Sequence, residues 1–418
     1  MANQEHLALI EQGVTVWNKW YQKNKRIIPD LTKANLSGFN LSGINLQKAD
    51  LNHANLSNAD LSKAQLVDAN LEGANFLAAN LENANLKGSN LDYVIFAQAK
   101  LNAKTIIATK ERNVWEIVNN KVQNKSFNGV DLRNSNLFRA DLRKADLSHA
   151  KLENANLNSA KLNNAYLFKA DLTRANLQNA DLRNAYFSQA NLTKAYFSGA
   201  LCCGTYFKDA ELKLANLKRA KFSQKTMIDL KWHSVWEIVN RGAVKKNLSG
   251  TDLSDANLQG VNFTEANLSH ANLSHAILSN SNLDLANLTN TDFSGANISG
   301  VDLHRANLKG AKLKSVVGRD TQLLAVKSND SNVMVKERPT TLQSITDNSI
   351  SQKVTAVRKP NKSKQKTNIF SLFLLGLSAC GVAGWYIFIN QNSNFNWQGI
   401  SQKLQPWKEK VEQLIPVN

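Results

Sequence analysis

Residues 140–157 read ADLRKADLSHAKLENANL, and a five-residue pattern runs through them. In each unit a small residue, here alanine, is followed two positions later by a large apolar residue, leucine. Reading every fifth residue outward from this stretch gives large apolar residues from Phe127 to Phe222, 20 units broken only by Cys202. A second run of 16 units extends from Leu31 to Ile106, and a third of 14 units extends from Leu248 to Leu313.

The five-residue spacing excludes both a flat strand and an α-helix. A strand alternates faces with a period of two, so an odd period cannot stay on one face of it. Positions i, i+5 and i+10 also move around the surface of an α-helix. We therefore expect the chain to turn a corner once per unit, with the alanine and leucine facing inward. Asn or Asp before the leucine suits such a turn, because its side chain can bond the nearby backbone. The pattern predicts a β-solenoid.

The charges indicate how many units make one coil. At a spacing of 20 residues Asp131, Lys151 and Asp171 fall in one column, so opposite charges stack. Coils of two or three units would instead place Asp131 beside Asp141 or Asp146, which is repulsive. We expect four units per coil.

These three runs resemble the pentapeptide-repeat family, through the motif A-(D/N)-L-x-x. The resemblance implies a right-handed quadrilateral β-helix that acts as an interaction module without a defined activity. The departures are few. Cys202 replaces a central leucine or phenylalanine, and a hydroxyl residue replaces the small alanine at Ser89, Ser135, Thr205 and Ser281.

Related segments that contain a Val-Trp pair precede the arrays, and the two later ones read VWEIVN at 114–119 and 235–240. Their apolar spacing predicts short helices that cover solenoid ends. The sequence leaves open whether the arrays form one continuous rod or hinged modules. The predicted divisions are an N-terminal helical cap at 1–30, arrays at 31–106, 127–223 and 248–314, helical inserts at 107–126 and 224–247, a basic flexible linker at 315–366, a transmembrane helix at 367–390 and a short amphipathic tail at 391–418.

The transmembrane prediction rests on residues 369–389, IFSLFLLGLSACGVAGWYIFI, which carry no charge and are long enough to cross a bilayer. A basic collar lies before them, so the positive-inside rule predicts a single-pass protein with cytoplasmic repeats and its C-terminus on the opposite side. By analogy with the family in photosynthetic bacteria, the membrane would be the plasma or thylakoid membrane. The collar consists of Arg358, Lys359, Lys362, Lys364 and Lys366.

Small residues recur within the predicted span at Gly376, Cys380 and Gly384. This spacing is typical of faces through which membrane helices self-associate, although ordinary glycine content explains it equally well.

We find no candidate catalytic, cofactor or metal site in the sequence. The histidines within the arrays occupy outward positions, and His270 and His275 would lie on adjacent sides of a coil. Cys202 should face inward as a small apolar residue, with Cys203 facing outward. We expect a protein that is not an enzyme and needs no cofactor.

One surface feature stands out in the middle array. Tyr166, Tyr186 and Tyr206 are 20 residues apart and should stack on one outward face, with Phe168 beside them. They form either a stacking ladder that stiffens the solenoid or a protein-docking surface, since exposed aromatic residues are favoured interface anchors.

The leading functional hypothesis is a membrane-anchored scaffold that presents a rigid rod to unidentified cytoplasmic protein partners. Binding of anionic lipid or nucleic acid is an alternative, because the chain carries 51 Lys and Arg against 33 Asp and Glu. Nucleic acid is disfavoured because the charges alternate in columns instead of forming a stripe. Modulation of a topoisomerase by DNA mimicry is disfavoured by the net charge of +18.

Overall fold

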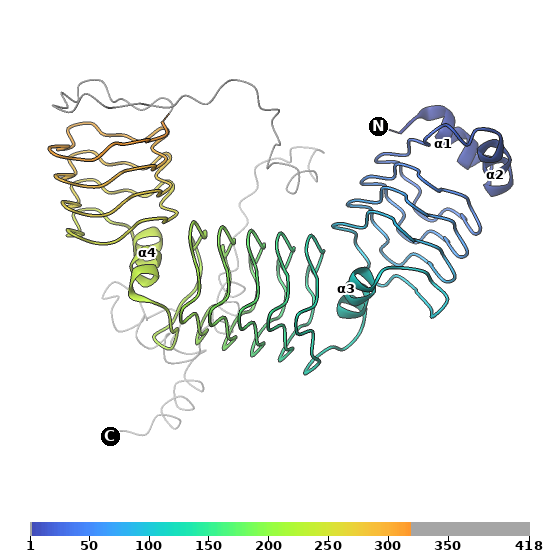
Figure 1. Ribbon diagram of the computed structural model, residues 1–418, viewed down its shortest axis with the longest axis horizontal. Coiled ribbons are helices and arrows are strands. Elements are labelled where there is room, and N and C mark those ends of the chain that lie inside the picture. The colour runs from blue at the N-terminus through green and yellow to red at the C-terminus, as the bar shows by residue number, and fades with distance from the viewer. Residues whose placement is uncertain (1, 319–418) are drawn as a thin grey trace, which may run out of the picture. The chain divides into compact units, whose positions relative to one another are not determined.

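The computed structural model describes residues 2–318 (Figure 1). These residues form three coiled arrays and four helices, α1 (Gln4–Glu11), α2 (Val14–Lys23), α3 (Thr109–Asn119) and α4 (Leu230–Arg241). None of the helices within residues 2–318 is long and apolar enough to cross a membrane. The predicted transmembrane helix and basic collar lie outside the described residues.

Four units make one coil, as the charge columns predict. Parallel bridges join residues 20 apart in each array, for example Asp131 to Lys151 and Lys151 to Asp171. Within the described residues the pairing consists of single bridges and not of extended strands. A corner every five residues explains this, because each side of the coil is too short for a longer ladder.

The pairing continues slightly past the predicted array ends, to Met227 and to Val317. The last bridges of the first two arrays, Asn85 to Ile106 and Tyr206 to Met227, are 21 apart. The predicted inward position of Ile106 is therefore wrong, because the extra residue turns this side chain outward and leaves it 52% exposed.

The interior is filled by the two inward positions of each unit. In the middle array Ala145, Leu147, Ala150 and Leu152 are fully buried, as the pattern predicts. Backbone bonds to the neighbouring coils hold these layers together. The Leu147 amide donates to the carbonyl of Tyr166 at 2.7 Å, and the Tyr166 amide donates back to Ala145 at 2.9 Å.

The corners place ordinary residues in the left-handed region. His149 has a φ of 59° and Asn154 also has a φ of 59°, a conformation that usually favours glycine. The side chain that begins each corner compensates in part. The Oδ1 atom of Asp146 accepts a bond from the Ser148 amide at 2.9 Å, and the amide oxygen of Asn156 accepts from Asn158 in the same way.

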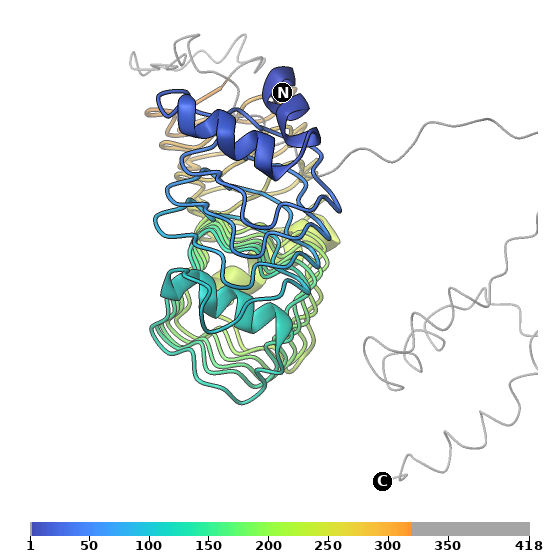
Figure 2. The same cartoon turned by 90° about the vertical axis from the view of Figure 1, so that its right-hand side faces the viewer.

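Helix α2 covers the N-terminal end of the first array. Trp17 Nε1 donates to the carbonyl of Asn45 at 2.6 Å, and the Tyr21 hydroxyl donates to the carbonyl of Gln47 at 2.9 Å. These carbonyls lie in the first coil, where no earlier coil can donate to them. In Figure 2 the blue helix α2 lies across one end of the first array and the teal helix α3 lies across the other.

Helices α3 and α4 are attached to the array that precedes each of them. Trp115 Nε1 donates to the carbonyl of Ala99 at 2.7 Å, and Asn119 Nδ2 donates to Phe96 at 2.9 Å. The same bonds recur at the equivalent residues of α4, where Trp236 Nε1 bonds Ala220 at 2.8 Å. The amide of Asn240 likewise bonds Leu217 at 3.0 Å. The two VWEIVN segments therefore close the C-terminal ends of the first and second arrays.

One corner of the coil continues through all three arrays, which we call the corner ladder. At this corner each left-handed residue donates its amide to the next coil, and the series crosses both helical inserts. The bond from Tyr93 to Asn134 joins the first two arrays at 2.7 Å, and the bond from Leu214 to Asp255 joins the second and third at 2.7 Å. The donors are Lys33, His53, Gly73, Tyr93, Asn134, Asn154, Arg174, Lys194, Leu214, Asp255, His275 and Gly295.

Candidate functional site

The three predicted tyrosines lie in one column on the outside of the middle array. Parallel bridges join Tyr166 to Tyr186 and Tyr186 to Tyr206. The rings of Tyr166 and Tyr186 stack with centroids 5.1 Å apart, whereas Tyr186 and Tyr206 are 6.3 Å apart and tilted. Tyr166 is 50% exposed and Tyr186 is 44% exposed, while Tyr206 is half-buried. Stacking and exposure therefore occur together in the same column.

Phe168 lies at the corner next to this column and is 38% exposed. The ring of His149 meets it edge-on at 5.7 Å, and Lys169 Nζ lies 5.2 Å from the ring centroid. These contacts come from the preceding coil and from the neighbouring residue. They hold the phenylalanine ring in place while leaving part of it exposed.

Phenylalanines fill the interior behind the tyrosines. Phe187 and Phe207 are buried, and their rings stack at 5.3 Å. This side of the coil therefore carries aromatic rings on both its outer and its inner face, and the buried rings support the exposed ones.

The structure adds a residue to this surface that the sequence pattern missed. Met227 bridges to Tyr206 and is 53% exposed, so it extends the column by one coil. The step from Tyr206 to Met227 is one position longer than a regular coil, so Met227, which counting in fives from Phe222 would place inward, lies on the outside. We call Tyr166, Phe168, Tyr186 and Tyr206 the aromatic strip.

The other two arrays show that the fold does not require these tyrosines. The equivalent positions in the first array, aligned through the VWEIVN segments, are Asn45, Gln65 and Asn85, and they make the same series of bridges. The equivalent positions in the third array are Asn287 and Asn307, which also bridge to each other. Polar side chains therefore serve the same structural position as the three tyrosines in two arrays, and the tyrosine column is a special feature of the middle array. The counterpart of Met227 is not polar, since Ile106 bridges to Asn85 in the first array and is 52% exposed.

The charged columns are stacked as predicted, but the carboxylates take different ionic partners. Asp131 pairs with Arg133 at 2.8 Å and Asp141 pairs with Arg143 at 2.7 Å, each two residues away within its own unit. The side-chain hydrogen bond from Arg133 is the main reason that the pKa of Asp131 lies below its ordinary value. The charge columns predict ion pairs between residues 20 apart. They do not predict these pairs within one unit, which form because a corner brings residues i and i+2 together.

The middle array also contains both cysteines of the described region. Cys202 is fully buried at a central position, and burial raises the pKa of its thiol. Cys203 beside it is half-buried. Within residues 2–318 no three side chains of the metal-binding types come together as a potential metal site.

The other predicted site residues form the basic collar from Arg358 to Lys366. They lie outside the described residues, so the aromatic strip is the predicted surface that the structure places.

Comparison with solved structures finds matches that include pentapeptide repeat proteins and a fluoroquinolone resistance protein. A pentapeptide repeat protein from the thylakoid lumen of Arabidopsis thaliana is 26% identical, with 27% of this chain and 77% of that chain covered and a TM-score of 0.25. HetL from the cyanobacterium Nostoc sp. strain PCC 7120, involved in heterocyst differentiation regulation, is 25% identical, with 69% and 92% covered and a TM-score of 0.12. QnrB1, a plasmid-mediated fluoroquinolone resistance protein, is 17% identical, with 47% and 88% covered and a TM-score of 0.19.

Among curated proteins no relative matches this chain. The family model for pentapeptide repeats, in contrast, matches more than half of the chain and all three arrays. The matched residues are 30–66, 64–102, 126–154, 150–189, 185–224, 247–284 and 277–314. The chain therefore belongs to the pentapeptide-repeat family.

Proposed function

We propose that this protein is a non-enzymatic, membrane-anchored scaffold that binds a protein partner through the aromatic strip. The observation that carries the proposal is the difference between the arrays. The middle array exposes a column of aromatic side chains at positions where the first array has Asn45, Gln65 and Asn85.

The chemistry of the aromatic strip suits a protein partner. Tyrosine and phenylalanine give large contact areas at low conformational cost, and tyrosine and tryptophan are enriched among binding hot spots. The rings of Tyr166 and Tyr186 already stack on each other, so each has one face that cannot stack on a base. A protein surface is therefore favoured over a nucleic acid.

Membrane anchoring is proposed from the sequence of residues 369–389 and the basic collar before it. An anchor would hold the arrays close to a bilayer and raise the local concentration of any bound partner. Labelling of lysine side chains in sealed vesicles with a reagent that does not cross the membrane tests the orientation. Labelling of the repeats from the cytoplasmic side supports it, and labelling of the tail with protection of the repeats from that side would contradict it.

The docking proposal is tested with substitutions taken from the chain itself. Tyr166→Asn, Tyr186→Gln and Tyr206→Asn together give the middle array the residues of the first array. A photo-crosslinking amino acid at Gln189, in the corner beside Tyr186, should yield specific adducts in native membranes, and the triple variant should lose most of them.

Tyr196→Asn supplies a matched control. Tyr196 is 41% exposed in a different column, between Asn176 and Asn216. This variant should leave the adducts unchanged. If the triple variant keeps all adducts while its circular dichroism is unaltered, the aromatic strip is not the docking surface.

A further inference from the structure

The two junctions between arrays are built in the same way. In the described residues one backbone hydrogen bond joins the first and second arrays, from Tyr93 to Asn134. One further bond joins the second and third arrays, from Leu214 to Asp255, at the equivalent position. Both bonds belong to the corner ladder. A helix, α3 or α4, separates the arrays elsewhere along the coil.

We propose that each junction is a hinge whose axis is the corner ladder and whose stiffness is set by a cluster of side chains, the corner clasp. Two coils within an array are joined by backbone bonds on every side, whereas a single backbone bond joins two arrays. Rotation about that single bond therefore breaks the fewest backbone contacts.

The helix moves with the array that precedes it. Trp115 and Asn119 hold α3 to the last coil of the first array by two side-chain hydrogen bonds, and Trp236 and Asn240 repeat this in α4. The surface that opens is therefore the one between each helix and the array that follows.

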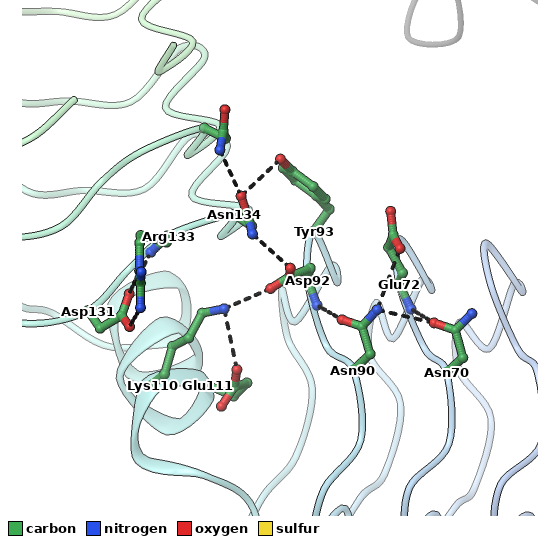
Figure 3. Close-up of polar contacts among 11 residues, drawn as sticks. Asn70, Glu72, Asn90, Asp92, Tyr93, Lys110, Glu111, Asp131, Arg133 and Asn134 are labelled. Atoms are coloured by element: carbon green, nitrogen blue, oxygen red, sulfur yellow. Dashed lines mark hydrogen bonds and ion pairs between the residues drawn. The ribbon is translucent and has the colours of Figure 1, made fainter. Parts of the chain in front are cut away.

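The first corner clasp is centred on the carboxylate of Asp92 (Figure 3). One oxygen accepts from Lys110 Nζ of α3 at 2.7 Å, and the other accepts from Asn134 Nδ2 of the second array at 2.8 Å. The Tyr93 hydroxyl lies 3.3 Å from Asn134 Oδ1. A single carboxylate thus connects the first array, the helix and the second array.

The second corner clasp is centred on an ammonium group. Lys231 of α4, which is the counterpart of Lys110, lies 3.1 Å from Asp252 Oδ2 and donates to Ser254 Oγ at 2.7 Å. Both acceptors belong to the third array. The two clasps therefore share the lysine position in the first turn of the helix but differ in the group on which they converge.

Buried residues at matched positions report opening of each hinge. Val122 lies just after α3 and Ala243 lies just after α4, before the first bridges of the following arrays, and both are fully buried. In the full-length chain we would introduce Val122→Cys or Ala243→Cys and follow modification by maleimide with peptide mass spectrometry, which distinguishes these cysteines from the native ones.

Asp92→Ala should accelerate modification at position 122 roughly two- to fivefold, the effect of losing a partly exposed charged contact to Asn134, and should leave position 243 unchanged. Lys231→Met should do the reverse. Lys110→Met is the matched control, because its contact with Asp92 lies within the first array and its helix, and it should react at close to the original rate. Partial unfolding would instead expose both cysteines in either variant.

Acceleration at both positions by either substitution would overturn the proposal, because it would show general destabilisation. Unchanged rates at position 122 in Asp92→Ala would overturn it as well, because the clasp would then not restrain the junction.

Discussion

At the scale of single residues, the small inward position tolerates a hydroxyl group when a carbonyl lies within reach. The Thr205 hydroxyl donates to the carbonyl of Leu182 at 2.7 Å, and the Ser281 hydroxyl donates to Leu258 at 2.9 Å. Ser135 occupies the same kind of position and is buried, but its hydroxyl has no hydrogen-bond partner. Replacing alanine with a hydroxyl residue is therefore expected to stabilise the fold where the hydroxyl finds a carbonyl and to destabilise it at Ser135.

Ser135→Ala should stabilise the protein by about 1 kcal/mol, because a buried hydroxyl without a partner is removed. Ser281→Ala should destabilise it by about 1 kcal/mol, since a satisfied hydrogen bond is lost. Urea unfolding of both variants measures the two changes. A loss of stability in Ser135→Ala would show that its hydroxyl finds a partner after all.

The acidic corners make stability depend on pH. Side-chain and backbone hydrogen bonds from Ser148 lower the pKa of Asp146, and the side-chain hydrogen bond from Arg143 lowers that of Asp141. A lowered folded-state pKa contributes stability above the unfolded value, about 3.9, and this contribution is lost as the pH falls through the folded-state pKa. We therefore expect melting temperatures to fall below about pH 4.

Asp146→Asn keeps an acceptor for the Ser148 amide but cannot titrate. Its melting temperature should consequently fall less steeply with acid than that of the parent chain. Equal slopes in thermal melts across this pH range would show that Asp146 contributes nothing to the acid transition.

At the scale of elements, the helices replace the coil that each array end lacks. Trp115 and Trp236 supply indole donors to the terminal carbonyls of Ala99 and Ala220. Each helix presents its tryptophan and its asparagine four residues apart, so both reach the same coil end. The helix is therefore part of the array's hydrogen bonding and not only an apolar cover.

Trp115→Phe keeps the apolar ring and removes this donor. We expect a local loss of about 1 kcal/mol, seen as faster hydrogen exchange in residues 95–100. Trp236→Phe should do the same in residues 216–221. Exchange within the middle coils serves as the internal control, and an increase there of equal size would contradict a local role.

The sequence alone predicts that these segments are helical, but it does not say which array they close. Each VWEIVN segment lies between two arrays, so its position in the chain is compatible with either. Helix α3 closes the first array because the Trp115 and Asn119 side chains donate hydrogen bonds to backbone carbonyls of its last coil. Such terminal carbonyls exist only once the coils are formed, and a repeat pattern does not reveal them.

At the scale of the whole molecule, the sequence predicts the arrays well because every unit repeats one rule. The inward positions and the four-unit coil follow from Ala, Leu and the charge columns alone. What it misses occurs where the register changes, as at Met227, which lies just beyond a regular coil from Tyr206. The corner ladder across the inserts is missed for the same reason, because a whole helical insert separates Tyr93 from Asn134.

Length should be adjustable in whole coils. Deleting residues 273–292 removes one complete coil and joins Asn272 to Phe293, so every inward position and every column is kept. We expect this variant to fold with a melting temperature within about 5 °C of the parent, since a solenoid's stability is a sum over neighbouring units.

Deleting residues 273–290 instead removes a length that is not a whole number of units and turns the later inward positions outward. This variant should lose the structure of the third array, which thermal unfolding followed by circular dichroism would detect. Equal stability of the two deletions would contradict a strict five-residue register.

The left-handed corners carry a consequence for digestion by proteases. Trypsin cleaves after lysine and arginine, and many such residues occupy corners, including Lys144, Lys169 and Lys194, each with a positive φ. Recognition of a substrate as an added β-strand requires several extended residues in succession, which a chain that bends every five residues does not offer. The arrays should therefore survive trypsin at native conditions despite their abundance of cleavable residues. A stable fragment that contains intact residues 127–223 would be the result to look for by mass spectrometry.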